Sequence, residues 1–161
     1  MGVEVKVQGL AEIERKLKQL PQRIGTNAMR RALRKGANVI RDAARANAKR
    51  IDDPGTSEQI GKNIVVQGGG RKRENQAGGP MVRVGVLGGA RDMGAYGELK
   101  GKGSGNPGGD TWYWRLIEFG TSRFRAQPFM RPAMNEKAQA AFDVAAAEAV
   151  KQTDRELAKL R

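Results

Sequence analysis

The fold of this chain is decided by the stretch Trp112-Tyr113-Trp114-Arg115-Leu116-Ile117-Glu118-Phe119-Gly120-Thr121 and by Pro128-Phe129-Met130-Arg131-Pro132-Ala133, which follows shortly after it. The aromatic and aliphatic residues of the first segment predict a strand over residues 112–119 that ends at Gly-Thr. Pro132 suits the first position of a helix, and the Ala-rich sequence behind it predicts a long helix over about residues 132–160. The apolar face of this helix is expected to contain Met134, Ala138, Phe142, Ala145, Ala149, Leu157 and Leu160.

The N-terminal segment contains two further patterns. Val3, Val5 and Val7 alternate with polar residues, and this period of two predicts a half-buried strand. Apolar residues at helical spacing then predict a short amphipathic helix over residues 10–20. Pro21 ends that helix and can occupy the first turn of the next one.

Residues 21–50 predict one long helix. Roughly 30 residues at a rise of 1.5 Å give about 45 Å, which is longer than a typical globular helix. The expected apolar stripe consists mainly of small residues, namely Ile24, Ala28, Ala32 or Leu33, Ala37, Ile40, Ala44 and Ala48. Much of the remaining helix surface is basic and includes Arg30, Arg34, Arg41 and Arg45.

The middle of the chain predicts a hairpin followed by a long insertion. Asp52-Asp53-Pro54-Gly55 predicts a turn, and Thr56-Ser57-Glu58-Gln59 is typical of a capping box that opens one helical turn. Residues 64–67 and 81–87 predict two strands, joined by a basic hairpin loop that contains Arg71, Lys72 and Arg73. Nine of the 23 residues at 88–110 are Gly, so we expect a flexible insertion that cannot offset the entropy of ordering.

These elements indicate an α+β fold in a single domain over residues 1–161. We expect a small, mainly antiparallel sheet, with one long helix in the N-terminal half and a long C-terminal helix packed on one face. A chain of 161 residues is long enough to bury a sizeable core. It contains no Cys, which excludes a disulfide framework.

Positive charge is concentrated near the N-terminus. The formal net charge is +13, and residues 1–50 contain 13 Lys or Arg against 4 Asp or Glu. Such a surface can bind nucleic acid, line a passage for DNA or meet an acidic protein, but it can also be an ordinary solvated helix face. No apolar run approaches the roughly 18 residues of a membrane span, and we expect no membrane partner and no export from the compartment of synthesis.

The residue types argue against an enzyme. The chain lacks both His and Cys, and therefore the commonest general base, the soft metal ligands and the usual partners of a nucleophile. The glycine clusters do not join a strand to a helix that carries Gly-Lys-Ser/Thr, so no phosphate-binding loop is predicted. We expect no catalytic residue, cofactor or metal site.

Two short motifs at a characteristic separation carry a family resemblance. Their residues are Glu118, Phe119, Gly120 and Thr121, followed by Pro128, Phe129, Arg131 and Pro132. With these motifs the chain resembles the tail-component family of tailed bacteriophages, the gene-product-ten-like proteins of lambdoid siphophages, of which the lambda minor tail protein Z is a distant relative. Thr56, Ile60, Asn63 and Ile64 fit a further family pattern in part, with Ser57 where Gly is usual.

The resemblance implies a structural virion protein of the neck and upper tail that is assembled in the host bacterial cytoplasm. The expected partners are further copies in a ring, a hexamer or a multiple of it, and the head-closure, tail-terminator and tail-tube proteins. Genomic DNA in the channel is a further candidate partner. The alternative is a small basic protein that binds DNA non-specifically. Candidate residues facing a partner or DNA are Arg30, Arg34, Arg41, Arg45, Arg71, Lys72, Arg73, Arg123 and Arg125.

Two details of the deciding stretch leave alternatives open. Glu118 lies among apolar residues and is expected to be buried, with Arg115, Arg123 or Arg131 as its ion-pair partner or in a direct subunit contact. Trp112-Tyr113-Trp114 predicts either a strand core with one aromatic exposed at an interface, or a platform for base stacking.

Overall fold

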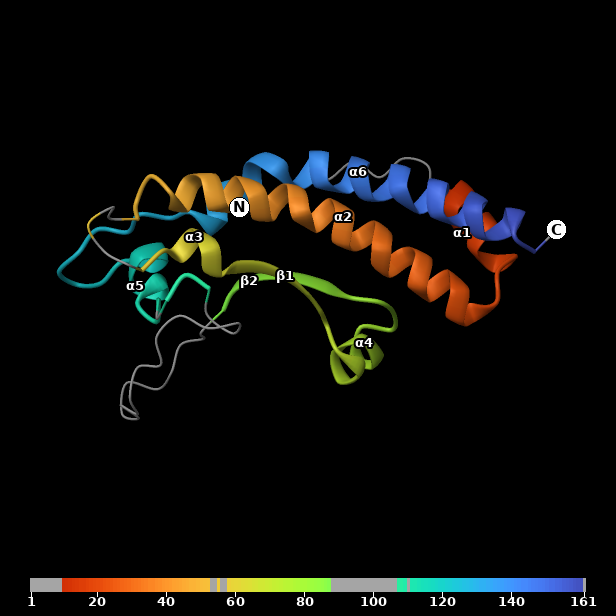
Figure 1. Ribbon diagram of the computed structural model, residues 1–161, viewed down its shortest axis with the longest axis horizontal. Helices are drawn as coiled ribbons and strands as arrows, with labels where there is room; N and C mark the ends of the chain where they lie inside the picture. The colour runs from red at the N-terminus through yellow and green to blue at the C-terminus, as the bar shows by residue number, and fades with distance from the viewer. Residues whose placement is uncertain (1–9, 53–54, 56–57, 88–106, 110, 161) are drawn as a thin grey trace. The chain divides into compact units, whose positions relative to one another are not determined.

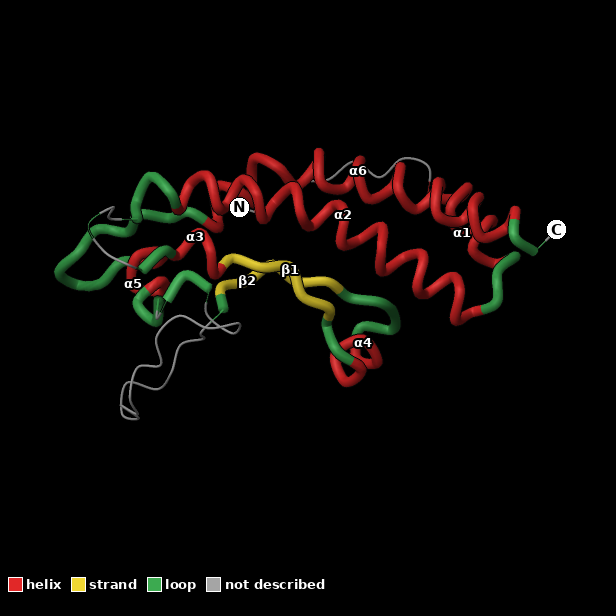
Figure 2. Tube along the Cα trace, viewed as in Figure 1, coloured by secondary structure: helices red, strands yellow, loops and turns green. Residues whose placement is uncertain are grey.

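The computed structural model describes residues 10–52, 55, 58–87, 107–109 and 111–160 (Figures 1 and 2). The predicted strand at residues 3–7 lies outside them. The described elements are α1 (Leu10–Lys18), α2 (Gln22–Ala48), α3 (Ile60–Asn63), β1 (Ile64–Gly68), α4 (Arg71–Gln76), β2 (Val82–Val86), α5 (Trp114–Phe119) and α6 (Met130–Ala158). The predicted α+β class is confirmed: a small antiparallel sheet accompanies two long helices, α2 and α6, that pack together.

The chain divides into two compact units. Unit 1 comprises Met1–Ile40, Val66–Arg83 and Lys137–Arg161, and unit 2 comprises Arg41–Val65 and Val84–Glu136. Helices α2 and α6 and both strands contribute residues to both units. The single domain over residues 1–161 stays a prediction.

The core of unit 1 is formed by α1, α2 and α6. Ile13, Ala32 and Ala149 are buried together, one from each helix. The helices approach closely because α2 has small residues at its contact with α6: a Cβ built on Gly36 would lie 2.4 Å from the carbonyl oxygen of Ala141. Of the predicted stripe, Ala28 and Ala32 are buried in unit 1 and Ala44 and Ala48 in unit 2, whereas Ile24, Ala37 and Ile40 are only partly buried.

β1 and β2 pair antiparallel in a register that two backbone hydrogen bonds define. The Gly69 N–H donates to the Met81 carbonyl at 2.8 Å, and the Leu87 N–H donates to the Asn63 carbonyl at 2.7 Å. Both predicted strands are confirmed. The hairpin between them is not a plain loop, however, because α4 forms within it.

α4 consists of strong helix-forming residues between two glycines with positive φ, Gly70 and Gly78. In unit 1 its Glu74 forms an ion pair with Arg30 of α2, with Nε to Oε1 at 3.2 Å. This pair holds the hairpin tip against α2.

The core of unit 2 surrounds the C-terminal turns of α2. Ala44, Ala48, Ile60, Ile64, Phe129 and Ala133 form a buried cluster, against which Val84 and Val86 of β2 pack. α3 begins at Ile60, later than the predicted capping box, and Asp52 caps it: the Ile60 N–H donates to Oδ1 at 2.9 Å and the Gly61 N–H to Oδ2 at 3.2 Å. Thr56 and Ser57 lie outside the described residues.

Asn63 anchors the end of the predicted glycine-rich insertion. Its side-chain amide donates to the Gly109 carbonyl and to Thr111 Oγ1, both at 2.8 Å, and its Oδ1 accepts from the Gly108 N–H at 2.7 Å. Gly108 and Gly109 are buried, so the predicted flexible loop ends earlier than residue 110. Residues 88–106 lie outside the described part of the chain.

The predicted strand at residues 112–119 is wrong, because Trp114–Phe119 is the helix α5. Trp114 and Ile117, three residues apart, pack against the unit 2 core, while Leu116 and Phe119 lie on the exposed side. In α6, Ala138 and Ala149 are buried as expected, but Met134 is exposed, and Leu160 lies beyond the end of the helix and is exposed as well. Pro132 is the third residue of α6 and not the first.

Candidate functional site: the Glu118 cluster

The two halves of the sequence motif meet at the carboxylate of Glu118. This side chain is only 1% exposed, although α5 is a short helix near the surface of unit 2. Oε2 accepts hydrogen bonds from the N–H groups of Phe129 at 2.7 Å and Met130 at 2.9 Å. Oε1 accepts from the Arg131 N–H at 3.0 Å and from Arg131 Nε at 3.3 Å. We call Glu118, Phe129, Met130 and Arg131 the Glu118 cluster.

Glu118 accepts the hydrogen bonds of the first N–H groups of α6. The first N–H groups of a helix have no partner inside the helix, and the helix dipole makes this end favourable for a negative charge. Glu118 supplies that charge from 11–13 residues earlier in the sequence. Arg131 closes the opposite side, since its Nη2 donates to the Glu118 backbone carbonyl at 2.6 Å. A buried carboxylate is thereby fully paired, as its burial requires.

Of the three arginines predicted as ion-pair partners of Glu118, the structure selects Arg131. Arg115 instead lies over the Trp114 ring at 5.4 Å from its centroid, and Arg123 is exposed. The structural ion pair that the sequence suggested is therefore confirmed.

The loop between the motif halves has a defined conformation. Gly120 has a φ of 75°, and a Cβ at this position would lie 2.8 Å from the Ala126 nitrogen. The Thr121 N–H donates to the Phe124 carbonyl at 2.9 Å, and Thr121 Oγ1 accepts from the Phe124 N–H at 3.0 Å. The Gln127 N–H donates to the Ile117 carbonyl at 2.8 Å. These bonds fix the loop on α5.

Phe129 anchors the cluster in the core. Its side chain is completely buried among Ala44, Ala48 and Ile60, and its carbonyl accepts a hydrogen bond from Asn47 Nδ2 at 3.3 Å. Pro128 is exposed before it. The motif residues Glu118, Phe119, Gly120, Thr121, Phe129 and Arg131 thus belong to one connected structure.

Large apolar side chains remain exposed on the outer side of this structure. Phe124 is 73% exposed, Phe119 64% and Leu116 42%. The Arg131 guanidinium covers one face of Phe119, with Cζ 5.2 Å from the ring centroid. Arg123 and Arg125 are exposed on the same loop. We call Leu116, Phe119, Phe124, Arg123, Arg125 and Arg131 the Phe119 patch.

The Trp112-Tyr113-Trp114 run is not an open stacking surface. Trp112 and Tyr113 meet edge to face with centroids 6.0 Å apart, and Tyr113 and Trp114 pack against the unit 2 core. Burial, with added effects from the neighbouring Glu58 and Asp52 carboxylates, raises the pKa of Tyr113 to about 12. Tyr113 and Trp114 are core aromatics as expected, but the predicted strand with one exposed aromatic is wrong, because all three residues are partly buried and Trp114 begins α5.

The basic residues predicted to face a partner or DNA have different surroundings. Arg30 is paired with Glu74, Arg41 with Asp42, and Arg45 donates from Nη2 to the Ile64 carbonyl at 2.7 Å. Arg34 is exposed on α2, and Arg71, Lys72 and Arg73 are exposed on α4. Their contact with a partner or with DNA stays a prediction.

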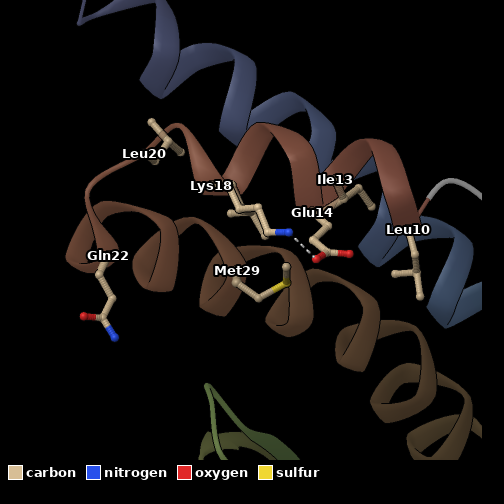
Figure 3. Close-up of a pocket in the computed structure, with 8 residues that line it drawn as sticks. Leu10, Ile13, Glu14, Lys18, Leu20, Gln22 and Met29 are labelled. Atoms are coloured by element: carbon tan, nitrogen blue, oxygen red, sulfur yellow. Dashed lines mark ion pairs between the residues drawn. The ribbon is translucent and has the colours of Figure 1, made fainter.

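An apolar groove lies between α1 and the start of α2 in unit 1 (Figure 3). Its volume is about 490 Å³, and its wall includes Leu10, Ile13, Leu17 and Met29. Its charged residues, Glu14 and Lys18, are paired with each other at 2.8 Å. The groove therefore presents no chemistry that selects a particular ligand.

The described residues hold no group of three or more side chains suited to bind a metal ion. None of the helices in the described ranges combines the length and apolarity needed to cross a membrane.

The comparisons with known proteins give one match. The family model described as "Bacteriophage HK97-gp10, putative tail-component" matches residues 11–120, which is more than half of the chain. The match includes Glu118 and Gly120, while the second half of the motif and α6 lie beyond its end. No curated protein and no solved structure matches the chain. The chain belongs to the HK97-gp10-like family of bacteriophage tail components.

Proposed function

We propose that this protein is a structural subunit of the phage neck and upper tail, where it forms a ring that joins or completes the tail at the head–tail interface. The observation that carries the proposal is the family match over residues 11–120, which supports a structural role in the phage tail. The ring, a hexamer or a multiple of it, and the contacts with head-closure, tail-terminator and tail-tube proteins are the finer part of the proposal.

The geometry of the Glu118 cluster supports an assembly role. A subunit that binds neighbours gains affinity when its contact surface is ordered before binding, because less conformational entropy is lost. The cluster orders the start of α6 and joins it to α5, which carries Phe119; Phe119 and Phe124 of the following loop both remain exposed. In this proposal the protein acts through complementary surfaces in the virion, without catalytic turnover.

Deletion of the gene from the phage tests this function. We expect filled heads and unattached or defective tails in electron micrographs of lysates, with infectivity restored by the wild-type protein supplied from a plasmid. Normal infectious particles from the deletion phage would refute the proposed role.

Non-specific DNA binding is the second candidate function. The observation that favours it is the exposed triplet Arg71, Lys72 and Arg73 on α4, next to the ion pair that holds the hairpin against α2. Lys and Arg side chains on a projecting element can neutralise phosphates without reading sequence. This function would be compatible with DNA passing through a ring. A DNA-binding assay with the isolated protein tests it.

A further inference from the structure

We infer that the Phe119 patch is a docking surface for an acidic, apolar surface on another virion protein. The inference rests on the proposed role at the head–tail interface and deepens it by naming the contact and the chemistry of the partner. Exposed aromatic side chains with neighbouring arginines are the composition enriched in protein–protein interfaces.

The three large apolar side chains of the patch are exposed. Leu116 and Phe119 are three residues apart on α5 and share its outer side, and Phe124 follows on the loop. Monomeric proteins rarely leave several large apolar side chains exposed together, and such groups mark interaction sites. All three belong to unit 2, as do the arginines beside them.

Hydrogen bonds hold the backbone that carries these side chains. Phe119 ends α5 beside Gly120, whose positive φ turns the chain, and Phe124 is held by two hydrogen bonds to Thr121. Arg131 contacts both the Phe119 ring and the Glu118 carboxylate. The backbone that carries Phe119 and Phe124 is therefore held by hydrogen bonds of α5 and of the loop, and this backbone needs little reorganisation on binding.

The positive charge around the patch indicates which kind of partner it fits. Residues 114–131 contain four arginines and one acidic residue, and that acid is the buried Glu118. Arg123 and Arg125 thus have no carboxylate within this segment to neutralise them at the surface. A partner with exposed carboxylates around an apolar centre would pair with the arginines and cover the phenylalanines.

The same charges disfavour two other occupants. A second copy docked through the same patch in a two-fold contact would oppose arginine with arginine. Single-stranded nucleic acid prefers a run of aromatic platforms, whereas Leu116 is aliphatic and Trp114 packs on the core. We therefore assign an acidic protein surface.

The test uses heads and tails purified separately from the deletion phage. Labelled full-length protein is bound to each at low and at moderate salt, and free protein is removed by sedimentation. One variant removes the aromatic rings, Phe119→Ala with Phe124→Ala, and another reverses the charge, Arg123→Glu with Arg125→Glu. The matched control is Leu160→Ala with Arg155→Glu, since Leu160 is 54% exposed and Arg155 is exposed outside the patch.

We expect the wild type to bind heads or tails with an affinity that falls as salt increases. Both patch variants should lose at least tenfold in affinity, whereas the control should stay within twofold. Thermal unfolding verifies that each variant is folded. We expect all variants to fold, because the substituted side chains are exposed. In hydrogen exchange, the amides of residues 116–125 should gain protection in the complex.

Four results would overturn the inference. Patch variants that bind like the wild type would exclude the patch, and so would wild-type protein that binds neither heads nor tails. Self-association of the isolated protein that only the patch variants abolish would assign the patch to a second copy. Competition by a single-stranded oligonucleotide would assign it to nucleic acid.

The failure of this inference is distinguishable from failure of the proposed function. If the wild type and both patch variants restore the deletion phage equally, the patch inference fails while the role at the head–tail interface stands. If the deletion phage is fully infectious, the proposed function fails, and the binding measurements still decide whether the patch docks on a virion surface.

Discussion

Glu118 shows how one residue can connect two distant segments of a short sequence motif. Its carboxylate receives three backbone N–H groups and one guanidinium N–H, and it has almost no contact with solvent. A hydrogen bond to a charged group contributes about 1.5–3 kcal/mol, and an unpaired buried group costs a similar amount. The start of α6 should therefore depend on this side chain more than on any local capping residue.

The Glu118→Gln substitution tests that dependence. The amide keeps the volume of the side chain, but its NH2 group would face N–H donors and its neutral oxygen would leave the Arg131 guanidinium without a carboxylate partner. We expect a loss of about 3 kcal/mol in the free energy of unfolding, measured by urea denaturation. Glu136→Gln, at an exposed position of α6, is the matched control and should stay within about 0.5 kcal/mol. Equal stability of the two variants would contradict the capping role.

Gly120→Ala tests the turn that follows α5. The new Cβ would lie 2.8 Å from the Ala126 nitrogen and 2.9 Å from the Phe124 carbonyl oxygen, in a backbone conformation with φ of 75°. We expect a cost of about 1–3 kcal/mol from strain. Gly79→Ala is the control, since no heavy atom lies within 4 Å of its built Cβ and its φ is not in the left-handed region. A Gly120→Ala variant as stable as this control would show that the turn can relax without cost.

At the scale of elements, α1 and the two long helices could be predicted, whereas α4 and α5 could not. The spacing of Ile13 and Leu17, and of Ala28, Ala32, Ala44 and Ala48, has the helical period over many residues, so α1 and α2 followed from local pattern. α4 has no apolar residue to carry a period. α5 is six residues long and begins with aromatics that favour strands, and six residues cannot distinguish the two periods.

Part of the candidate site could also be predicted from the sequence, and part could not. The motif residues and an arginine partner for Glu118 were predictable from composition, because a carboxylate among apolar residues must be paired. The backbone donors at residues 129–131 were not, since they depend on α5 and the start of α6 meeting in space. The α3 cap that Asp52 provides and the hydrogen bonds of Asn63 to residues 108–111 were missed for this reason too.

The contact of α2 with α6 in unit 1 gives a prediction at this scale. Replacing a helical Gly with Ala normally stabilises a protein by up to about 1 kcal/mol. At Gly36 the added methyl would lie 2.4 Å from the Ala141 carbonyl oxygen and 2.9 Å from the Ala145 Cβ, so Gly36→Ala should instead destabilise by about 1–3 kcal/mol.

Gly25 in the same helix provides the control. Its nearest neighbour to a built Cβ is Leu17 Cδ2 at 3.5 Å, an ordinary contact, so Gly25→Ala should raise the free energy of unfolding. Thermal and urea unfolding of both variants measure the difference in sign. A stabilised Gly36→Ala variant would mean that α2 and α6 separate more easily than the close contact suggests.

At the scale of the whole molecule, the net charge of +13 distinguishes two kinds of basic residue. Arg30, Arg45 and Arg131 are engaged within the fold, by Glu74, the Ile64 carbonyl and Glu118. The triplet on α4 and the pair on the motif loop are exposed. Total charge therefore overstates the positive surface that a partner can meet, and the two exposed groups can be tested separately.

The final prediction is that DNA binding and head–tail joining depend on different exposed cations. The variant Arg71→Gln with Lys72→Gln and Arg73→Gln removes three positive charges from α4. Each phosphate contact contributes about 0.9 to the slope of log affinity against log salt, so the magnitude of the slope for duplex DNA should fall by about 2–3. Fluorescence anisotropy over a salt series measures it.

The same variant should restore infectivity to the deletion phage, whereas Arg123→Glu with Arg125→Glu should not. An unchanged salt slope would mean that α4 is only solvated, and a joining defect in the α4 variant as large as that of the loop variant would mean that both basic groups meet the same protein neighbour.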